Sequence, residues 1–293
     1  MHTLKHAKKP KWLRKKLPRG PVYEDVRRML NKGQLHTVCQ EAKCPNIWEC
    51  FSRRTATFLI LGNRCTRNCR FCAVEHGHPM PPDPEEPKRV AVAAKQLGLE
   101  YVVVTSVTRD DLPDGGAGLF AETILEIRRQ IPHAKVEVLI PDFKGDDKAL
   151  ATVLKARPDV LNHNIETVSR LYDLARPGAD YFRSLRLLKK VTTTFPDIPT
   201  KSGIMLGLGE TGEEIDQTLR DIHATGCKIV TIGQYLQPSL DHLPVALYVP
   251  PEEFEYWKGR ALEIGFVEVM SGPFVRSSYH AREMYQTLLE AAP

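Results

Sequence analysis

The sequence predicts an α/β fold in which a mostly parallel sheet forms a partial, open (β/α)6 barrel of the TIM type, with N- and C-terminal extensions. From Thr57 onward, short apolar runs alternate with amphipathic stretches, the pattern of parallel strands joined by crossover helices. The 293 residues, 42% of them hydrophobic, allow one barrel-sized domain or two ordinary ones. Six strand–helix units are fewer than the eight that close a barrel.

The predicted elements follow one another regularly along the chain. Apolar runs predict strands at 57–62, 101–107, 136–141, 159–166, 200–209 and 228–236. Amphipathic stretches predict helices at 88–97, 118–130, 146–156, 182–194 and 213–224. These elements divide the chain into a basic tail (1–20), an N-terminal extension (21–56), a barrel core (57–240) and a C-terminal extension (241–293).

Six of the seven cysteines form two triplets, which predict two metal centres. The first triplet, with spacing C-x4-C-x5-C, consists of Cys39, Cys44 and Cys50. The second, with spacing C-x3-C-x2-C, consists of Cys65, Cys69 and Cys72, and it directly follows the first predicted strand. Three thiolates on a [4Fe–4S] cluster leave one iron open for chemistry. The carboxyl ends of barrel strands are the expected place for that chemistry.

Other roles for the cysteines fit the sequence less well. Disulfide frameworks belong to short secreted domains, whereas this chain is long and begins without an apolar signal segment. Structural zinc sites usually present paired C-x2-C knuckles, which neither spacing supplies. The seventh cysteine, Cys227, stands alone before an apolar run and is predicted to be a small buried hydrophobe.

Composition also bears on the compartment. No apolar run approaches the ~20 residues that a membrane span needs, and thiolate metal ligands need a reducing compartment. We therefore expect a soluble, cytoplasmic protein without a membrane partner.

The positive charge is concentrated at the N-terminus. Residues 1–20 contain eight Lys and Arg and no acid, so the whole chain's net charge of +5 leaves −3 for the remainder. No nucleic-acid-binding motif lies nearby, and a transit peptide would be richer in Arg and Ser. A solvated arm and a docking segment for an acidic protein both remain open.

The cysteine-rich motifs resemble a known family. The sequence CTRNCRFC, with Phe71 before the last cysteine, resembles the cluster loop of the radical S-adenosylmethionine (SAM) superfamily. Together with HTVCQEAKCPNIWEC upstream and FVRSSYHA near the end, it resembles the lipoyl synthase family from about Leu35 to Ala281.

The resemblance implies the cofactors and some of their ligands. It implies two [4Fe–4S] clusters and SAM, which chelates the open iron of the second-triplet cluster and is cleaved to a 5′-deoxyadenosyl radical. In the family a serine of the RSSY segment supplies the fourth ligand of the other cluster, which predicts Ser278, with Ser277 as the close alternative. A capped turn is the ordinary explanation of such a serine pair.

Polar residues at the ends of the predicted strands are candidate SAM contacts. Turn formation and helix capping explain each one singly, but their shared position on one rim favours a ligand. The predicted contacts are Thr105, Ser106, Asn162, Asn164, Glu166 and Lys201. The glycines of GIMLGLGE lack the third glycine of a dinucleotide fingerprint and are compatible with packing against adenine.

The function implied by the resemblance is insertion of two sulfur atoms, at C6 and C8 of an octanoyl chain linked to a carrier lysine. Unactivated carbons cannot react by polar acid–base catalysis, so a radical is needed. Expected partners are octanoylated carrier domains, such as 2-oxoacid dehydrogenase E2 or glycine cleavage H protein, and an electron donor such as ferredoxin or flavodoxin. Another sulfur-inserting or methylthiolating radical SAM enzyme, or a non-catalytic iron–sulfur or zinc protein, is the alternative.

Overall fold

The computed structural model describes residues 9–14 and 20–290. Its main element is a sheet of eight strands, which follow one another in space as β1-β2-β5-β6-β7-β8-β9-β10. These strands are β1 (His36–Thr37), β2 (Thr57–Ile60), β5 (Tyr101–Ser106), β6 (Lys135–Leu139), β7 (Val160–Asn162), β8 (Thr200–Leu206), β9 (Ile229–Gln234) and β10 (Glu268–Gly272). A separate pair is formed by β3 (Arg64–Cys65) and β4 (Glu75–His76).

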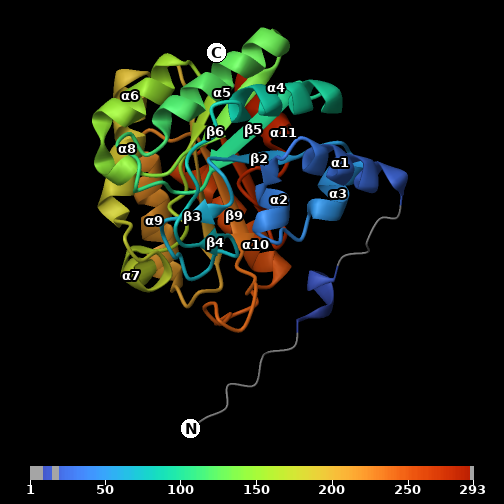
Figure 1. Cartoon of the computed structure of the whole chain (residues 1–293). Helices are drawn as coiled ribbons and strands as arrows, with labels where there is room; N and C mark the ends of the chain where they lie inside the picture. Colours follow the sequence, from blue (N-terminus) through green and yellow to red (C-terminus); the bar gives the residue numbers. More distant parts are fainter. Residues whose placement is uncertain (1–8, 15–19, 291–293) are drawn as a thin grey trace.

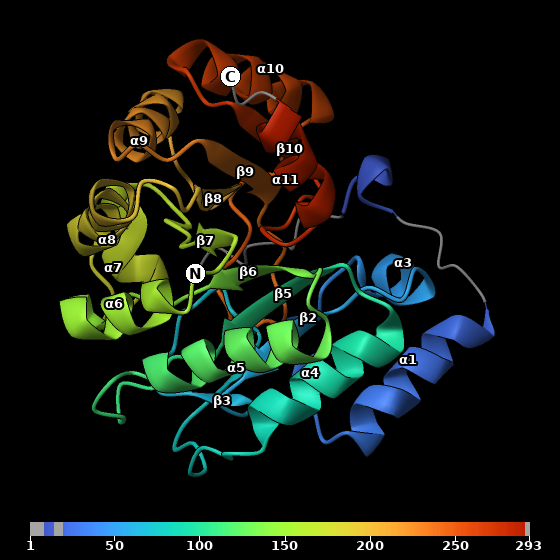
Figure 2. The same ribbon diagram turned by 90° about the horizontal axis from the view of Figure 1, so that it is seen from above.

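The six predicted strands are present as β2 and β5 to β9, all paired in parallel and in chain order. The partial-barrel prediction is confirmed, because the sheet has β1 at one edge and β10 at the other, with no pairing between them among the described residues. Figure 2 shows the strands curving in an open arc. Strand β1 pairs with β2 in antiparallel fashion.

Helices cover the outer side of this arc (Figures 1 and 2). The five predicted helices are α4 (Glu86–Leu97), α5 (Ala117–Gln130), α6 (Asp147–Lys155), α8 (Tyr181–Thr194) and α9 (Gly212–Ala224). The N-terminal part adds the 3-10 turn η1 (Lys11–Leu13), α1 (Pro21–Lys32), α2 (Val38–Glu41) and α3 (Ile47–Ser52). The remaining elements are η2 (Phe143–Gly145), η3 (Ser169–Leu171), α7 (Tyr172–Ala175), α10 (Pro251–Ile264) and α11 (Ala281–Glu290).

The sheet differs from the prediction at two places. The predicted strand 159–166 ends early, at Asn162, and continues only as an isolated bridge between Glu166, with φ +72°, and Ile204. Strand β10 was not predicted, because the segment EVMSG has no continuous apolar run. It joins β9 in parallel and follows α10, so the C-terminal part adds one more helix–strand unit to the sheet.

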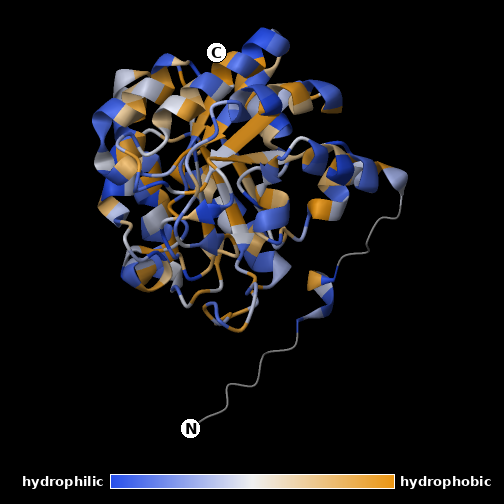
Figure 3. Cartoon of the chain, in the orientation of Figure 1, coloured by the Kyte–Doolittle hydropathy of each residue, from blue (hydrophilic) through white to orange (hydrophobic). Residues whose placement is uncertain are grey.

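Burial follows the layers. Apolar side chains of the strands and of the inner helix faces form two large clusters, one over β2, β5 and β6 and one over β8 and β9. The strands are mainly hydrophobic and the outer helix faces mainly hydrophilic (Figure 3). Burial of this apolar surface is the main stabilising contribution to the fold.

The C-terminal helix α11 lies against the amino ends of the strands. The ring of Tyr285 packs on that of Tyr101, which begins β5, with centroids 5.6 Å apart. Met284 and Leu288 pack against Ile229 at the start of β9. Since α11 occupies the amino end of the barrel, the carboxyl end is left for ligands.

Much of the predicted basic tail lies outside the described residues, which omit 1–8, 15–19 and 291–293 and with them five of its eight cations. No helix in the described ranges is long and apolar enough to cross a membrane.

Candidate active site

The second cysteine triplet lies in a loop that leaves the carboxyl end of β2, as predicted. The chain turns there through left-handed residues, Leu61 with φ +68° and Gly62 with φ +86°. The Thr108 backbone N–H donates to Cys65 Sγ at 3.3 Å. Burial, reinforced by the neighbouring Cys69 and Cys65, raises the pKa of the Cys72 thiol to about 12. Buried thiols of this kind are held as thiolates by a metal centre, which removes the proton outright.

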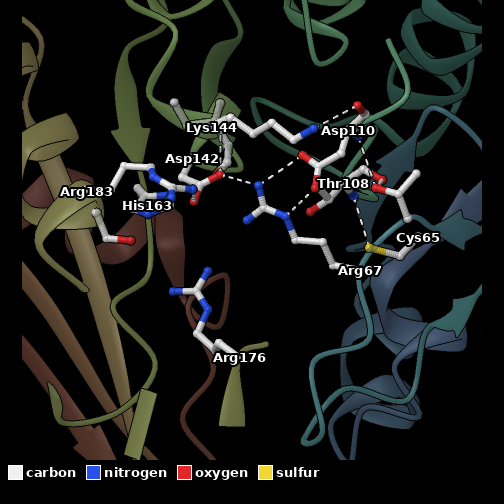
Figure 4. Close-up of polar contacts among 12 residues, drawn as sticks. Cys65, Arg67, Thr108, Asp110, Asp142, Lys144, His163, Arg176 and Arg183 are labelled. Carbon is white, nitrogen blue, oxygen red and sulfur yellow. Dashed lines mark hydrogen bonds and ion pairs between the residues drawn. The ribbon is translucent and has the colours of Figure 1, made fainter. Parts of the chain in front are cut away.

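An arginine within the cysteine loop fixes that loop to the segments that follow β5 and β6. Arg67 donates to Asp110 at 2.7 and 2.9 Å and to Asp142 at 2.7 Å (Figure 4). Asp142 also accepts from Arg183 at 3.1 Å. Although burial would raise it, hydrogen bonds and charge from Arg67 lower the pKa of Asp142 to about 2. These residues were not among the predicted site residues.

The loop is also held from the opposite side of the barrel. His242 Nε2 donates to the Cys72 carbonyl at 2.9 Å, and the Leu243 N–H donates to the Arg70 carbonyl at 3.0 Å. Phe71 packs in a cluster with Tyr235. The segment after β9 thus supports the loop beside the last cysteine.

The glycine-containing segment after β8 forms a tight turn next to this cluster. Glu210 accepts hydrogen bonds from the backbone N–H groups of Gly207 and Leu208, and Leu208 packs in the same cluster as Phe71. Gly207 has φ +103°, and a Cβ there would lie 2.4 Å from the Leu247 carbonyl oxygen. Only glycine fits, so this turn presents backbone instead of side chain to the site.

Three of the predicted SAM contacts lie at the rim with unused hydrogen-bonding capacity or acidic character. Ser106 Oγ and Asn164 Oδ1 are buried and have no hydrogen-bond partner within the described chain. Asn164 Nδ2 donates to Glu166 Oε1 at 3.0 Å. Burial raises the pKa of Glu166, while the charges of Arg176 and Arg276 oppose that shift. Buried polar atoms normally find a partner, so these positions fit a polar ligand.

The other three predicted contacts have partners inside the chain. Thr105 Oγ1 donates to the Leu139 carbonyl at 2.8 Å. Lys201 Nζ lies 3.1 Å from Glu137 Oε1, and both side chains are only 1% exposed. Asn162 Nδ2 donates to the same carboxylate at 3.1 Å, while its buried Oδ1 has no hydrogen-bond partner within the described chain. Lys201 and Asn162 thus belong to a buried ion-pair network inside the barrel.

Two residues that the sequence did not single out complete the rim. Arg176 donates to the Asn164 carbonyl at 3.0 Å and the Tyr172 hydroxyl at 2.6 Å, and its Nε is buried without a partner in the described part. His163 donates from Nδ1 to the Ile140 carbonyl at 2.8 Å. Burial and the charge of Arg176 lower the pKa of His163 to about 4, so its ring is neutral at pH 7. His163 carries the same strand-end signal as the predicted contacts Asn162 and Asn164 beside it, whereas no local sequence signal identifies Arg176.

The first cysteine triplet and the RSSY serines line one cavity, of about 140 Å³. Its lining includes Cys39, Cys44, Cys50, Arg276, Ser277 and Ser278. Residues 9–14 and 20–290 contain no group of three or more His, Cys, Asp or Glu side chains placed to hold a single metal ion. Because they share this cavity, both candidate serines, which come from the far end of the chain, lie near the three thiols.

The two sites touch each other through one side chain. Asn164 Nδ2 donates to Ser277 Oγ at 3.3 Å as well as to Glu166. A Cβ at position 203 would lie 3.0 Å from Asn164 Oδ1 and 2.5 Å from Thr231 Oγ1, so Gly203 makes room for this asparagine. The polar rim and the first-triplet cavity are consequently adjacent.

A thiolate triplet at the carboxyl end of an open parallel barrel is the arrangement of radical SAM proteins. Residues 59–222 match the model of the Radical SAM superfamily, and the chain belongs to that superfamily. Solved structures with the same fold include Streptococcus suis SuiB bound to S-adenosylmethionine (TM-score 0.56, 11% identity, 77% of this chain and 53% of that one) and the [FeFe]-hydrogenase maturase HydG (0.54, 14%, 92% and 74%). At such identities they show the fold alone.

Curated relatives define the family within the superfamily. Residues 2–44 match the N-terminal domain of lipoyl synthase. The chain is 58% identical to the lipoyl synthase of Caldanaerobacter subterraneus subsp. tengcongensis, over 94% of this chain and 96% of that one, and 57% identical to that of Desulfotalea psychrophila, over 95% and 93%. The chain belongs to the lipoyl synthase family, which confirms the resemblance.

Family membership settles the class of chemistry. The protein is a radical SAM sulfurtransferase, which uses SAM and a [4Fe–4S] cluster and acts on an octanoylated carrier protein.

Proposed function

We propose that this chain inserts two sulfur atoms, at C6 and C8 of an octanoyl chain amide-linked to a carrier lysine, and consumes two SAM per lipoyl group. The observation that supports this most directly is the adjacency of the two sites, with Asn164 bonded to Glu166 on one side and Ser277 on the other. A carbon activated at the rim needs to travel only a short distance to a sulfur source in the first-triplet cavity.

The residues present fit two [4Fe–4S] clusters. The three thiols of the second triplet leave one iron free for SAM. The three thiols of the first triplet, together with a serine hydroxyl, suit a cluster in which every iron has a protein ligand. When bound, SAM and the second-triplet cluster would supply an adenosyl radical, and the first-triplet cluster would supply the inserted sulfur. The protein's part is to bind, orient and exclude water.

The hydrogen bonds favour Ser278 over Ser277 as the fourth ligand. Ser277 Oγ already accepts from Asn164 at 3.3 Å. Ser278 makes no side-chain hydrogen bond within the described residues, and it lines the cavity of Cys39, Cys44 and Cys50. An alkoxide is a harder ligand than thiolate and suits this iron less well, so the cluster that it completes is the easier one to dismantle.

SAM contacts are assigned by the unused polar atoms of the rim. We assign Ser106, Asn164 and Glu166 to its ribose, adenine and ammonium groups, and Arg176 to its carboxylate. Thr105 and Lys201 stay predictions, since each already has a partner in the chain. Asn162 also stays a prediction: its Nδ2 is bonded to Glu137, while its buried Oδ1 leaves one acceptor for SAM.

The partners follow from the substrate. E2 or H-protein carrier domains would present the octanoyl-lysine, and a ferredoxin or flavodoxin would supply electrons. The six metal-binding thiols call for a reducing compartment, so we propose the cytoplasm.

One experiment tests the function. Anaerobically reconstituted protein is incubated with SAM, a reductant and an octanoyl-lysine peptide, and the peptide mass is measured. A gain of two sulfurs is expected together with about eight irons per chain. Stoichiometric zinc and an unchanged peptide mass would indicate a binding protein instead.

A further inference from the structure

The turn that contains Ser277 and Ser278 is joined to the α3 segment by two hydrogen bonds between residues far apart in sequence. Asn46 Nδ2 donates to the Phe274 carbonyl at 2.7 Å, across 228 positions. The Tyr279 hydroxyl donates to Glu49 Oε1 at 3.0 Å, across 230 positions. We call these two bonds the clamp.

The clamp bonds lie next to the proposed ligands in sequence. Glu49 immediately precedes Cys50, and Tyr279 immediately follows Ser278. Asn46 lies two residues after Cys44. Each bond therefore limits the distance between a thiol on one segment and the hydroxyl on the other.

The side chain of Asn46 bonds to the turn and does not cap its own helix. Asn46 is the N-cap residue of α3, where asparagine normally accepts from its own helix. Here its side chain makes no capping bond and instead donates to Phe274, and the residue is only 1% exposed. Its side chain thus joins two segments and leaves the helix end without a side-chain cap.

We propose that Asn46, Glu49 and Tyr279 are positioning residues that hold the Ser278 hydroxyl at the iron of the first-triplet cluster. This inference rests on the proposed function. A weak ligand binds in proportion to its effective concentration, which is set by how firmly its segment is held near the metal. Because an alkoxide is a weak ligand here, the clamp decides how long that iron is retained.

The test measures iron release to a chelator from reconstituted full-length protein. Tyr279→Phe removes the donor and keeps the ring, so release of the first iron should be about tenfold faster, the size of effect of a hydrogen bond to a charged group. Glu49→Gln keeps an acceptor oxygen but removes its charge, so its release rate should lie between those of wild type and Tyr279→Phe. Tyr181→Phe is the matched control, since the Tyr181 hydroxyl donates to Asp221 at 2.8 Å and its release rate should not change.

Two further readouts separate positioning from general destabilisation. Amide hydrogen exchange over 274–280 should rise in Tyr279→Phe and not in the Tyr181→Phe control. After one-electron oxidation with ferricyanide, the cluster that remains should give the EPR signal of a three-iron cluster. Reductive SAM cleavage should equal that of wild type. Glu49→Ala removes the same bond from its other side, and combining it with Tyr279→Phe should add little to either change.

Two results would overturn the proposal in distinguishable ways. Wild-type protein that holds only about four irons would contradict the proposed function itself, and the clamp with it. Wild-type protein with about eight irons, from which Tyr279→Phe and Glu49→Ala lose iron no faster, would overturn the clamp alone.

Discussion

The loop of Cys65, Cys69 and Cys72 is one continuous stretch at the end of β2, whereas the cavity of Cys39 and Cys44 is completed by serines from the other end of the chain. Arg67 fixes the loop through a buried ion-pair network. In our proposal, a cluster in the cavity depends on the clamp and on the Ser278 hydroxyl. Under the proposed function, this difference fits one centre that persists and another that is consumed.

The largest expected effect comes from removing single thiols. Cys65→Ala, Cys69→Ala or Cys72→Ala should abolish reductive SAM cleavage, because the open iron is lost. Cys39→Ala, Cys44→Ala or Cys50→Ala should leave SAM cleavage detectable and end sulfur insertion. Chromatography of 5′-deoxyadenosine and mass spectrometry of the peptide measure the two. Lipoyl product from the first-triplet variants would refute a consumed cluster.

A consumed cluster also limits turnover. Without a system that rebuilds it, the protein should make no more than about one lipoyl group per chain, since a cluster that has given up sulfide cannot restore itself. Reconstitution with ³⁴S-sulfide should place the label in the product. Repeated turnover with unlabelled product would point to an external sulfur donor.

Substitutions of Ser278 test whether its hydroxyl makes the first-triplet cluster the less stable of the two. Ser278→Ala should lower sulfur insertion more than about tenfold, since even residues that only orient metal ligands have effects of that size. Ser278→Cys should retain the iron more firmly and release sulfide more slowly. Product formed in a single turnover is the measurement, with Ser277→Ala as the milder control. Wild-type rates in both Ser278 variants would remove this residue from the ligand set.

The second-triplet loop should be sensitive to acid through Asp142. Its pKa of about 2 lies below the ~3.9 of an unfolded aspartate. A group shifted in this direction stabilises the fold fully above the unfolded value and loses that contribution as the pH falls through the folded value. Asp142→Asn should therefore lower the free energy of unfolding by about 2 kcal/mol at pH 7.

Urea unfolding at several pH values checks this expectation. The gap between wild type and Asp142→Asn should narrow from about pH 4 to about pH 2. The matched control is Asp197→Asn, which disrupts a solvent-exposed pair with Arg157 and should barely change stability. A gap of the same size at both ends of the range would contradict the assigned role of Asp142.

The smallest effect is expected from the basic tail. Its eight cations should attract an acidic carrier over the ~8 Å Debye length at physiological salt, speeding encounter more than strengthening binding. Deleting 1–19 should slow turnover of intact carrier domain, most at low ionic strength, and leave a neutral octanoyl-lysine peptide unaffected. Equal slowing of both substrates at every salt concentration would rule out docking by the tail.

The features that could be predicted from the sequence are those set by residues close together in the chain. Apolar runs identified the six strands, and spacing identified both triplets. Strand β10 was missed because its side chains are only partly apolar and its partner β9 supplies the pairing. Arg67 and the polar end of Lys201 are each satisfied by carboxylates more than 40 positions away, at Asp110 and Glu137. No single-sequence pattern announces such pairs.

The position of the RSSY turn, just before α11, means that the two proposed metal sites are completed at different points of synthesis. Chains emerge from the ribosome N-terminus first, so a site can be completed only after its last residue has been made. The second-triplet loop has all the supports described above once residue 243 has been made, whereas the first triplet, although translated earlier, lacks the RSSY serines until the turn just before α11 appears. Helix α11 follows the turn and packs on β5 through Tyr285 and Tyr101. The site that is translated first is therefore the last to be completed. A chain that ends before Arg276 has the three thiols of the first triplet but lacks the serine hydroxyl that completes their ligand set.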